Sequence, residues 1–348
     1  GVAVFLVGLA AFRMLRPARI RPPVGSAGTL PDPRALARSS RTEANLAFTG
    51  DKRFLTSASG QCFVMYQIQG HSWIVMGDPV GAQEEWSDLL WQLREQADAA
   101  QGRLLLYQIS ADALPLAIEL GLQIVKYGEE ALVDLNGFCI EGPAARALRY
   151  AERRAAREGA TFEIVPAARM PEMIDTLGGI SDRWLQNKGH REKGFSVGRF
   201  DADYVARFDC AIVRQGERIV AFANIWTTAD RQELSVDLMR HDDDMPYGTM
   251  DFLFINLMLW GRAQGYARFS LGLAPLSGLE ARRLAPLWAK LGALLYRHGE
   301  ALYGFEGLRA YKDKYAPVWE ARFVAGPQGL SLGRALIDLQ ALIAARKS

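Results

Sequence analysis

The feature that most constrains the fold of this chain is an order of predicted elements that occurs twice: an antiparallel hairpin, a helix, then another strand. The first occurrence comprises predicted strands at 62–69 and 72–77, a helix at 84–100 and a buried strand at 104–109. The second comprises strands at 210–214, 218–226 and 233–239, a helix at 247–263 and a strand at 267–272. The repeat predicts a duplicated α/β (α+β) unit, with two mixed sheets flanked by helices.

This order resembles a tandem form of the GNAT-like acyltransferase fold. In that fold a central strand leads into a helix whose N-terminus binds a phosphate-bearing acyl donor through backbone amides and the helix dipole. The corresponding helix start contains Pro246, Gly248 and Thr249, residue types that suit a helix N-terminus. The acetyl-coenzyme A signature of the fold, Gln/Arg-x-x-Gly-x-Gly/Ala, is missing here, so acetyl-coenzyme A is not the expected donor.

A second informative feature is the segment 181–200, which begins like a helix and then becomes rich in cations and glycine. Its expected substrate-binding side chains are Lys188, His190, Arg191 and Lys193, set among Gly189, Gly194 and Gly198. Such a loop can bring backbone amides and positive charge to an anion such as phosphate. A solvated basic loop is the alternative interpretation.

Composition limits the other classes of function. The 348 residues can form one large core or two ordinary ones, and the formal net charge of +2 means that an anionic partner must meet a local patch. The three cysteines and four histidines show no CxxC or HExxH spacing, so neither a metal site nor a disulfide framework is predicted.

The N-terminus reads as the cut end of a transmembrane helix. Residues 1–12 are apolar throughout, four arginines follow by residue 21, and residues 17–33 have the Pro and Gly content of a linker. A complete span needs about 20 apolar residues. The arginines would lie on the cytoplasmic side.

Three segments together resemble a known family: SDRWLQNKGHREKGFSVGRF, DLMRHDDDMPYGTMDFLF and GFEGLRAYKDKYAPVW. They are similar to the cytoplasmic synthase domain of bacterial aminoacyl-phosphatidylglycerol synthases, of which the phosphatidylglycerol lysyltransferases are the best-populated branch. The resemblance covers about residues 34–345. It implies a tandem GNAT-like domain behind a membrane flippase domain that this sequence does not contain.

The resemblance also implies an activity, partners and a location. The family transfers an amino acid, lysine first among the candidates, from aminoacyl-tRNA to a glycerol hydroxyl of phosphatidylglycerol, without a cofactor. The product lipid gives resistance to cationic antimicrobial peptides. The domain would lie against the anionic surface of the bacterial inner membrane, on its cytoplasmic side. The expected divisions are 1–33 for the helix end and linker, 34–160 for the first GNAT-like domain and 161–348 for the second, which carries most of the active site.

Asp237 and Arg240 are two of the three expected catalytic residues. They lie three apart near the end of a predicted strand, so they face one site only if the strand bends near Met239. Asp237 would hold the α-ammonium of the aminoacyl group or position the nucleophile, and Arg240 would bind a phosphate or the terminal adenosine. A surface ion pair is the alternative.

Lys312 is the third expected catalytic residue. On a helix it shares a face with Phe305, Leu308 and Tyr315, and a lysine on an apolar face either extends along the core or points into a cleft. We expect the cleft, with Lys312 polarising the ester carbonyl. Glu306, Arg309 and Tyr315 of the same segment are expected to bind substrate.

A further cationic face is predicted on the helix at 142–158, where Arg146, Arg149, Arg153 and Arg157 recur every three or four residues. It could bind the tRNA backbone or anionic lipid, or it could be a solvated face. The transferred amino acid is not fixed by the sequence. An acidic pocket for a lysyl ammonium could involve Asp242, Asp243 and Asp244, which read equally well as an exposed acidic turn.

Three other functions are weighed against this one. A Fem-like tRNA-dependent aminoacyltransferase acting on a peptidoglycan precursor has the same fold class. A non-catalytic lipid- or tRNA-binding module would not need Asp237, Arg240 and Lys312. A serine hydrolase is suggested by G-x-S-x-G at 194–198 and 329–333, but the first match follows no core strand and the second has no His after it.

Overall fold

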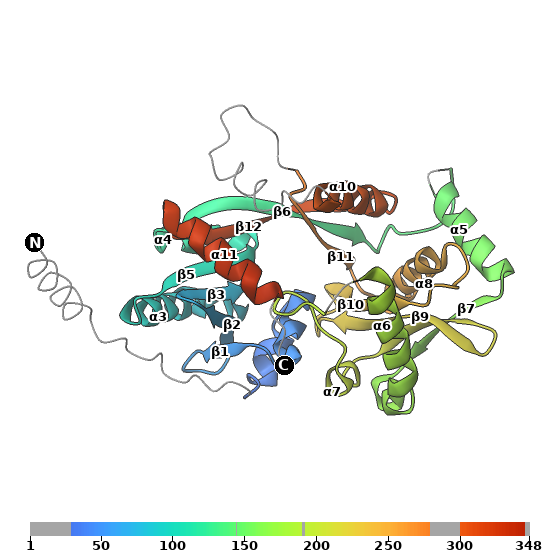
Figure 1. The fold of residues 1–348 in the computed structure, drawn as a ribbon, viewed down its shortest axis with the longest axis horizontal. Coiled ribbons are helices and arrows are strands. Elements are labelled where there is room, and N and C mark those ends of the chain that lie inside the picture. The colour runs from blue at the N-terminus through green and yellow to red at the C-terminus, as the bar shows by residue number, and fades with distance from the viewer. Residues whose placement is uncertain (1–28, 144, 190–191, 279–299, 345–348) are drawn as a thin grey trace, which may run out of the picture.

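The computed structural model describes residues 29–143, 145–189, 192–278 and 300–344, with the backbone alone for 300–306 (Figure 1). The apolar start of the chain, residues 1–12, and the arginines after it lie outside these residues. Within the described ranges, no helix has the length and apolar character needed to cross a membrane.

A mixed sheet runs through the whole described molecule, and helices flank it. Its strands follow the order β1-β2-β3-β5-β12-β6-β11-β10-β9-β8-β7, and β4 pairs with β2. Their bounds are β1 Arg53–Thr56, β2 Cys62–Gln69, β3 Ser72–Met76, β4 Val80–Gly81, β5 Arg103–Ile109, β6 Gln123–Asp134, β7 Ala160–Val165, β8 Cys210–Gln215, β9 Arg218–Thr227, β10 Glu233–His241, β11 Arg268–Pro275 and β12 Val318–Gly326.

The repeat predicted from the sequence is present. In the first half the hairpin β2–β3 leads through α3 to β5, which pairs parallel with β3. In the second half β8, β9 and β10 form an antiparallel meander that leads through α8 to β11, which pairs parallel with β10. The α/β class and the GNAT-like order are therefore confirmed.

The two expected sheets are continuous. β12 pairs antiparallel with β5 on one side and with β6 on the other, and β6 pairs with β11. Each half would otherwise present an open strand edge at this point, and the shared strands cover both edges. β12 and the last helix, α11, lie late in the sequence, yet they pack with elements of the first half. The expected domain boundaries at residues 33 and 160 stay predictions.

The helices pack on both faces of this sheet (Figure 1). α11 contacts β2, β3 and β5, α6 contacts β9 and β10, and α8 contacts β7, β8 and β9 and supports α5. Their bounds are α2 Pro33–Ala37, α3 Trp86–Ala99, α4 Leu114–Glu119, α5 Arg146–Arg157, α6 Ile174–Lys188, α7 Ala202–Val205, α8 Thr249–Ala263, α10 Glu300–Asp313 and α11 Leu330–Ala344, with 3₁₀ helices η1 Thr42–Thr49, η2 Gln83–Glu85, η3 Ala111–Ala113 and η4 Ala167–Glu172.

One hydrophobic core joins the two halves. It contains Met65 and Ile74 of the first half, Leu332 of α11, and Leu177 and Phe222 of the second half. Separate clusters lie under α3 and α4, and under α5 and α8. Because burial of apolar side chains is the main stabilising contribution, the shared core ties the two repeats together.

Candidate active site

The second half of the sheet opens where the first half stays closed. β10 and β11 pair over three residues only, 233–235 with 268–270, although β10 continues to His241 and β11 to Pro275. β3 and β5 pair over five residues, 72–76 with 103–107, and the amide of Gly77 adds a further bond to Tyr107. Sites in α/β sheets form at the carboxyl ends of strands that separate. The opening between β10 and β11 is therefore the candidate active site.

A β-bulge in β10 brings Asp237 and Arg240 to the same face. The register against β9 shifts between Val236 and Met239, and Asn224 fills the gap by accepting a 2.7 Å hydrogen bond from the Leu238 amide. An extra residue in a strand reverses the alternation of the side chains that follow it. The bend that the sequence analysis required for this pair is present.

Asp237 lies in a polar environment supplied by the segment after α6. Its carboxylate accepts 2.5 Å and 2.9 Å hydrogen bonds from the Tyr204 hydroxyl and the Gly198 amide. Burial raises the pKa of Asp237, while these hydrogen bonds and the charge of Arg240 act in the opposite direction. A carboxyl whose pKa is raised in this way binds a proton more readily than an ordinary aspartate, which suits a general base.

Arg240 is 9% exposed and only partly paired. Its Nη2 donates to Glu192 at 3.1 Å, and its guanidinium carbon lies 4.2 Å from the centroid of the Trp184 ring. Its Nε is buried and has no hydrogen-bond partner among the described residues. Burial lowers the pKa of Arg240, and the charges of Glu192 and Asp237 oppose that shift. A guanidinium N–H that interacts with Asp237 can donate a hydrogen bond to an anionic or carbonyl oxygen.

Lys312 lies at the other wall of the opening. Its buried ammonium donates 2.9 Å hydrogen bonds to the carbonyls of Gly272 and Leu273, where β11 has its own register shift. Burial lowers the pKa of Lys312 to about 8, against the charge of Glu130. Among the described residues two of its three donors are used, which leaves one N–H for a substrate oxygen.

The other predicted residues of α10 and the following turn are engaged with protein groups. Arg309 contacts the Glu129 carboxylate and the Ser277 hydroxyl, and its guanidinium carbon lies 4.2 Å from the Trp319 ring centroid. Tyr315 is buried and its hydroxyl donates to Asp251 at 3.0 Å. The side chain of Glu306 lies outside the described residues.

The start of α8 is the helix N-terminus expected from the sequence. Gly248 precedes the helix with φ 84, and the buried Thr249 donates from its hydroxyl to the Pro246 carbonyl at 2.7 Å. Asp251 lies in the first turn and accepts hydrogen bonds from Tyr311 and Lys314 as well as Tyr315. A carboxylate of the protein therefore already meets the positive end of this helix dipole.

The basic segment after α6 divides into two parts. Lys188 at the end of α6 and Lys193 are exposed, while His190 and Arg191 lie outside the described residues. The rest of the segment turns inward, where a Cβ at Gly198 would lie 1.9 Å from an Asp237 oxygen. Gly198 is therefore needed for the close approach of this segment to Asp237.

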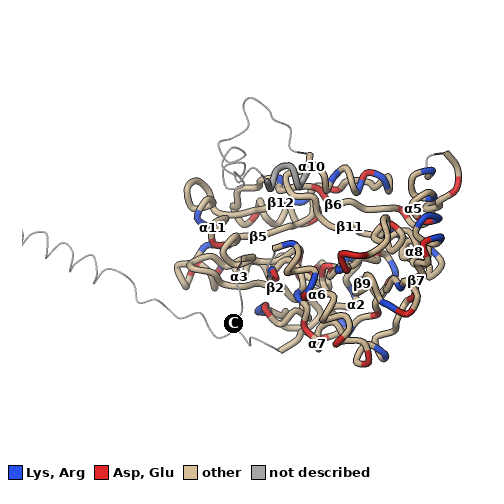
Figure 2. Tube along the Cα trace, turned by 45° about the vertical axis from the view of Figure 1, so that its right-hand side comes forward, with Lys and Arg blue, Asp and Glu red and all other residues tan. Residues whose placement is uncertain are grey.

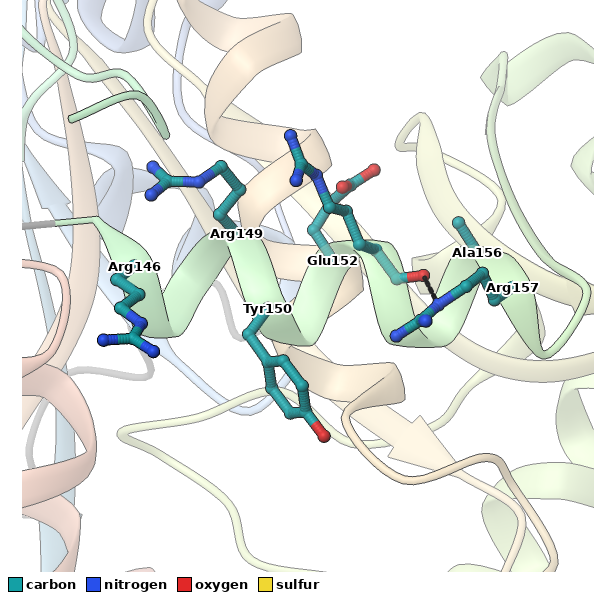
Figure 3. Close-up of a pocket in the computed structure, with 7 residues that line it drawn as sticks. Arg146, Arg149, Tyr150, Glu152, Ala156 and Arg157 are labelled. Atoms are coloured by element: carbon teal, nitrogen blue, oxygen red, sulfur yellow. Dashed lines mark hydrogen bonds between the residues drawn. The ribbon is translucent and has the colours of Figure 1, made fainter. Parts of the chain in front are cut away.

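The cationic face predicted at 142–158 is present on α5 (Figure 2). Seven residues line an open hollow of about 720 Å³ along it: Arg146, Arg149, Tyr150, Glu152, Arg153, Ala156 and Arg157 (Figure 3). Arg149 donates to the Ile140 and Gly142 carbonyls. Within the described residues, Arg146 and Arg153 form no side-chain hydrogen bond or ion pair, so their charges face solvent.

Two of the three carboxylates of the acidic turn 242–244 form ion pairs with neighbouring arginines. Arg183 pairs with Asp242, and Arg218 pairs with Asp244, each at 2.7 Å. Asn187 donates to Asp243. These two ion pairs favour the structural interpretation of Asp242 and Asp244, while the exposed Asp243 has only the neutral Asn187 as a partner among the described residues.

Several residues around Asp237 escaped the sequence analysis: Tyr204, Glu192, Asn224, Asp51 and Lys52. Glu192 lies within the basic segment 181–200 without a predicted role, the other four belong to no predicted motif, and each reaches the site through tertiary contacts. The available signal was composition, because Asn224 is a polar residue within the apolar run of β9 and is fully buried.

The chain is similar to proteins of one family. The family description "Phosphatidylglycerol lysyltransferase, C-terminal" matches residues 33–326. A phosphatidylglycerol lysyltransferase of Bacillus subtilis is 34% identical over 327 residues, which are 92% of this chain and 38% of that protein. This chain thus spans well under half of that relative.

Two solved structures have the same fold. A C-terminal domain attributed to a lysylphosphatidylglycerol synthetase of Agrobacterium fabrum is 42% identical with a TM-score of 0.83, covering 90% of this chain and 96% of that one. L-PGS from Bacillus licheniformis is 35% identical with a TM-score of 0.79, covering 92% and 99%.

Proposed function

The chain belongs to the family of phosphatidylglycerol lysyltransferase C-terminal domains, and from this premise we propose that it transfers a lysyl group from aminoacyl-tRNA to a glycerol hydroxyl of phosphatidylglycerol. The observation that carries the proposal is the bulge of β10, which turns Asp237 and Arg240 toward one face beside the opening between β10 and β11. Transfer of an acyl group from one ester to a new alcohol needs a positioned hydroxyl, a proton acceptor and stabilisation of an oxyanion.

In the proposed mechanism Asp237 accepts the proton of the attacking glycerol hydroxyl. The hydroxyl oxygen forms a bond to the acyl carbon, and the bond from that carbon to the ribose oxygen of the tRNA breaks. Asp237 then returns the proton to the ribose oxygen, so the carboxylate is regenerated. Its raised pKa supports this cycle, because a carboxyl that binds a proton more readily is a better general base.

Arg240 and Lys312 would stabilise the negative charge that develops on the acyl oxygen or lies on the lipid phosphate. Within the part of the chain that the structure describes, the Nε of Arg240 is buried without a partner and Lys312 retains one N–H. Donors that are fixed in place before the reaction cost no reorganisation during it. Because burial lowers the pKa of Lys312 to about 8, its contribution should weaken in alkaline solution.

For the tRNA we propose the α5 face, defined as Arg146, Arg149, Tyr150, Arg153 and Arg157. Its cations recur at about one helical turn, roughly 5 Å apart along the axis, which suits successive phosphates of one strand. Tyr150 is 58% exposed and can stack with a base or sugar. Leu148 and Ala155 face the protein core, so α5 lacks an apolar face for insertion into lipid.

The family also supports a location and a larger assembly. We propose that the domain works at the cytoplasmic face of a bacterial inner membrane, behind an N-terminal flippase domain in the complete protein. Aminoacylation makes the lipid less negative, which would weaken the binding of cationic antimicrobial peptides.

A direct test is incubation of the purified chain with phosphatidylglycerol vesicles and, separately, Lys-, Ala- and Arg-tRNA, followed by mass spectrometry of the lipids. Lysyl-phosphatidylglycerol is expected from the first mixture. Transfer from another tRNA would change the amino acid assigned. Absence of an aminoacyl lipid from all three mixtures, with aminoacylation of a muropeptide precursor supplied in place of the vesicles, would favour the Fem-like alternative.

A further inference from the structure

A residue of the first half fastens the segment that carries Gly198. The Phe195 amide donates to Asp51 Oδ2 at 2.7 Å, although 144 residues separate the two in sequence. Phe195 has φ 65, a left-handed conformation that is unfavourable for an aromatic residue, and its side chain is 1% exposed. The hydrogen bond and the burial of the ring together hold this segment in an otherwise unfavourable conformation.

Asp51 is itself fixed by a buried cation. Lys52 is 3% exposed and its Nζ lies 2.7 Å from Asp51 Oδ1. The Thr49 hydroxyl donates to the same oxygen at 2.6 Å and accepts from Lys52 at 2.8 Å. Lys52 Nζ also lies 5.5 Å from the centroid of the Phe195 ring. A buried lysine is costly unless it is paired, so the ion pair with Asp51 and the hydrogen bond to Thr49 hold Lys52 and Asp51 in one fixed arrangement.

The segment fastened by Asp51 reaches both members of the proposed catalytic pair. On one side of Phe195, Glu192 accepts from Arg240 at 3.1 Å and from the Phe200 amide at 3.2 Å. On the other side, the Gly198 amide donates to Asp237. The Gly194 amide adds a 3.2 Å bond to the Ile343 carbonyl of α11. Residues 192–200 therefore connect first-half elements to both Asp237 and Arg240.

We propose that Asp51 and Lys52 are positioning residues of the transfer site, which hold residues 192–200 so that Gly198 and Glu192 orient Asp237 and Arg240. The proposal rests on the proposed function, since it assigns the pair to that reaction. It also gives the first half a task in a site whose catalytic groups lie in the second half.

Lys52 has a second, electrostatic effect on Asp237. Three titratable groups act on this carboxyl: Tyr204 of α7, Arg240 of β10 and Lys52, which precedes β1. The positive charges of Arg240 and Lys52 both lower the pKa of Asp237. Removal of the Lys52 charge would therefore raise the pKa of Asp237 further. The acid side of the pH–rate profile should then move to higher pH.

The kinetic experiment compares Lys52→Met with Lys52→Arg in the lysyl-transfer assay across pH. Lys52→Met should move the acid limb of kcat/KM upward, while Lys52→Arg should leave the limb where it is in the wild type. If Lys52→Met instead loses rate by the same factor at every pH, the charge of Lys52 does not affect the pKa of Asp237. That result would overturn the electrostatic part of the proposal.

The second experiment does not depend on activity. Hydrogen–deuterium exchange of Asp51→Asn, and of the milder Thr49→Val, is measured by mass spectrometry on peptides covering 192–200. Exchange should accelerate at least tenfold there and stay unchanged in β8. Wild-type exchange at 192–200 in both variants would refute the positioning role. If exchange at 192–200 is altered in the variants but the wild-type protein shows no transfer activity, the proposed function alone is refuted and the positioning role stands.

Discussion

The Gly198 amide donates a 2.9 Å hydrogen bond to the carboxylate of Asp237, which lies 39 residues further along the chain. The contact is possible only because Gly198 has no side chain: a Cβ there would lie 1.9 Å from the second Asp237 oxygen and 2.7 Å from the Tyr204 ring. The glycine thus controls how closely the segment after α6 approaches the proposed general base.

Gly198→Ala should displace either Asp237 or the segment and lower lysyl transfer by about 100-fold, the loss typical of a misplacement near 1 Å. The far-UV circular dichroism spectrum should be unchanged, because the segment belongs to no helix or strand. The assay is initial-rate formation of aminoacyl lipid. Gly307→Ala in α10 is the matched control, since a Cβ there meets no atom within 4 Å, and it should retain wild-type transfer.

Asp237→Asn should lower transfer by about 10²- to 10⁴-fold, the usual contribution of a general base. The same substitution should stabilise the fold at neutral pH. Burial raises the folded pKa of Asp237 above its ordinary value of 3.8, so wild-type stability falls as pH rises through that interval, and an amide avoids the loss. Urea unfolding of both proteins at pH 4 and pH 7 measures the difference in their free energies of unfolding. Equal stability of the two proteins at pH 7 would contradict the expected stabilisation by Asp237→Asn.

Much of the fold could be predicted because local pattern and tertiary structure agree. The hairpin β2–β3 and helix α8 lie within two residues of their predicted bounds, since each combines apolar periodicity with glycine at its ends, and β11 starts one residue and ends three residues after its predicted bounds. The pairing of β12 between β5 and β6 could not be predicted, because a strand's partners depend on edges that distant segments leave open.

The site was less predictable for a related reason. Asp237 and Arg240 could be named from one motif, but their shared face depends on the bulge that Asn224 fills from the neighbouring strand. Likewise, no local pattern connects Asp51 to Phe195. Residues that act on a site through tertiary contacts leave little trace in the spacing of a single sequence.

Lys312 should make the stability of the protein depend on alkaline pH. Its pKa is lowered from 10.5 to about 8, so between these values the unfolded chain binds a proton that the folded chain does not, and stability rises with pH. From pH 7 to 10.5 the wild type should gain on the order of 3 kcal/mol relative to Lys312→Met. Denaturant unfolding of both proteins measures this difference.

Lys193→Met, which removes an exposed lysine, is the control for that measurement and should follow the wild type. In the transfer assay Lys312→Met should be much slower than wild type at pH 7, where the ammonium is charged. Near-normal transfer by a folded Lys312→Met would remove this lysine from the mechanism and leave it a structural role on the Gly272 and Leu273 carbonyls.

Replacement of Arg146 and Arg153 by Gln should weaken tRNA binding and reduce its dependence on salt. Each phosphate contact contributes about 0.7 to 0.9 to the slope of log K against log salt, so the double variant should lose about 1.5 from that slope. Filter binding or fluorescence anisotropy at several salt concentrations measures it. Arg94→Gln, which removes a cation already paired with Asp98 on α3, should leave the slope unchanged. A wild-type slope in the double variant would place the tRNA on another surface.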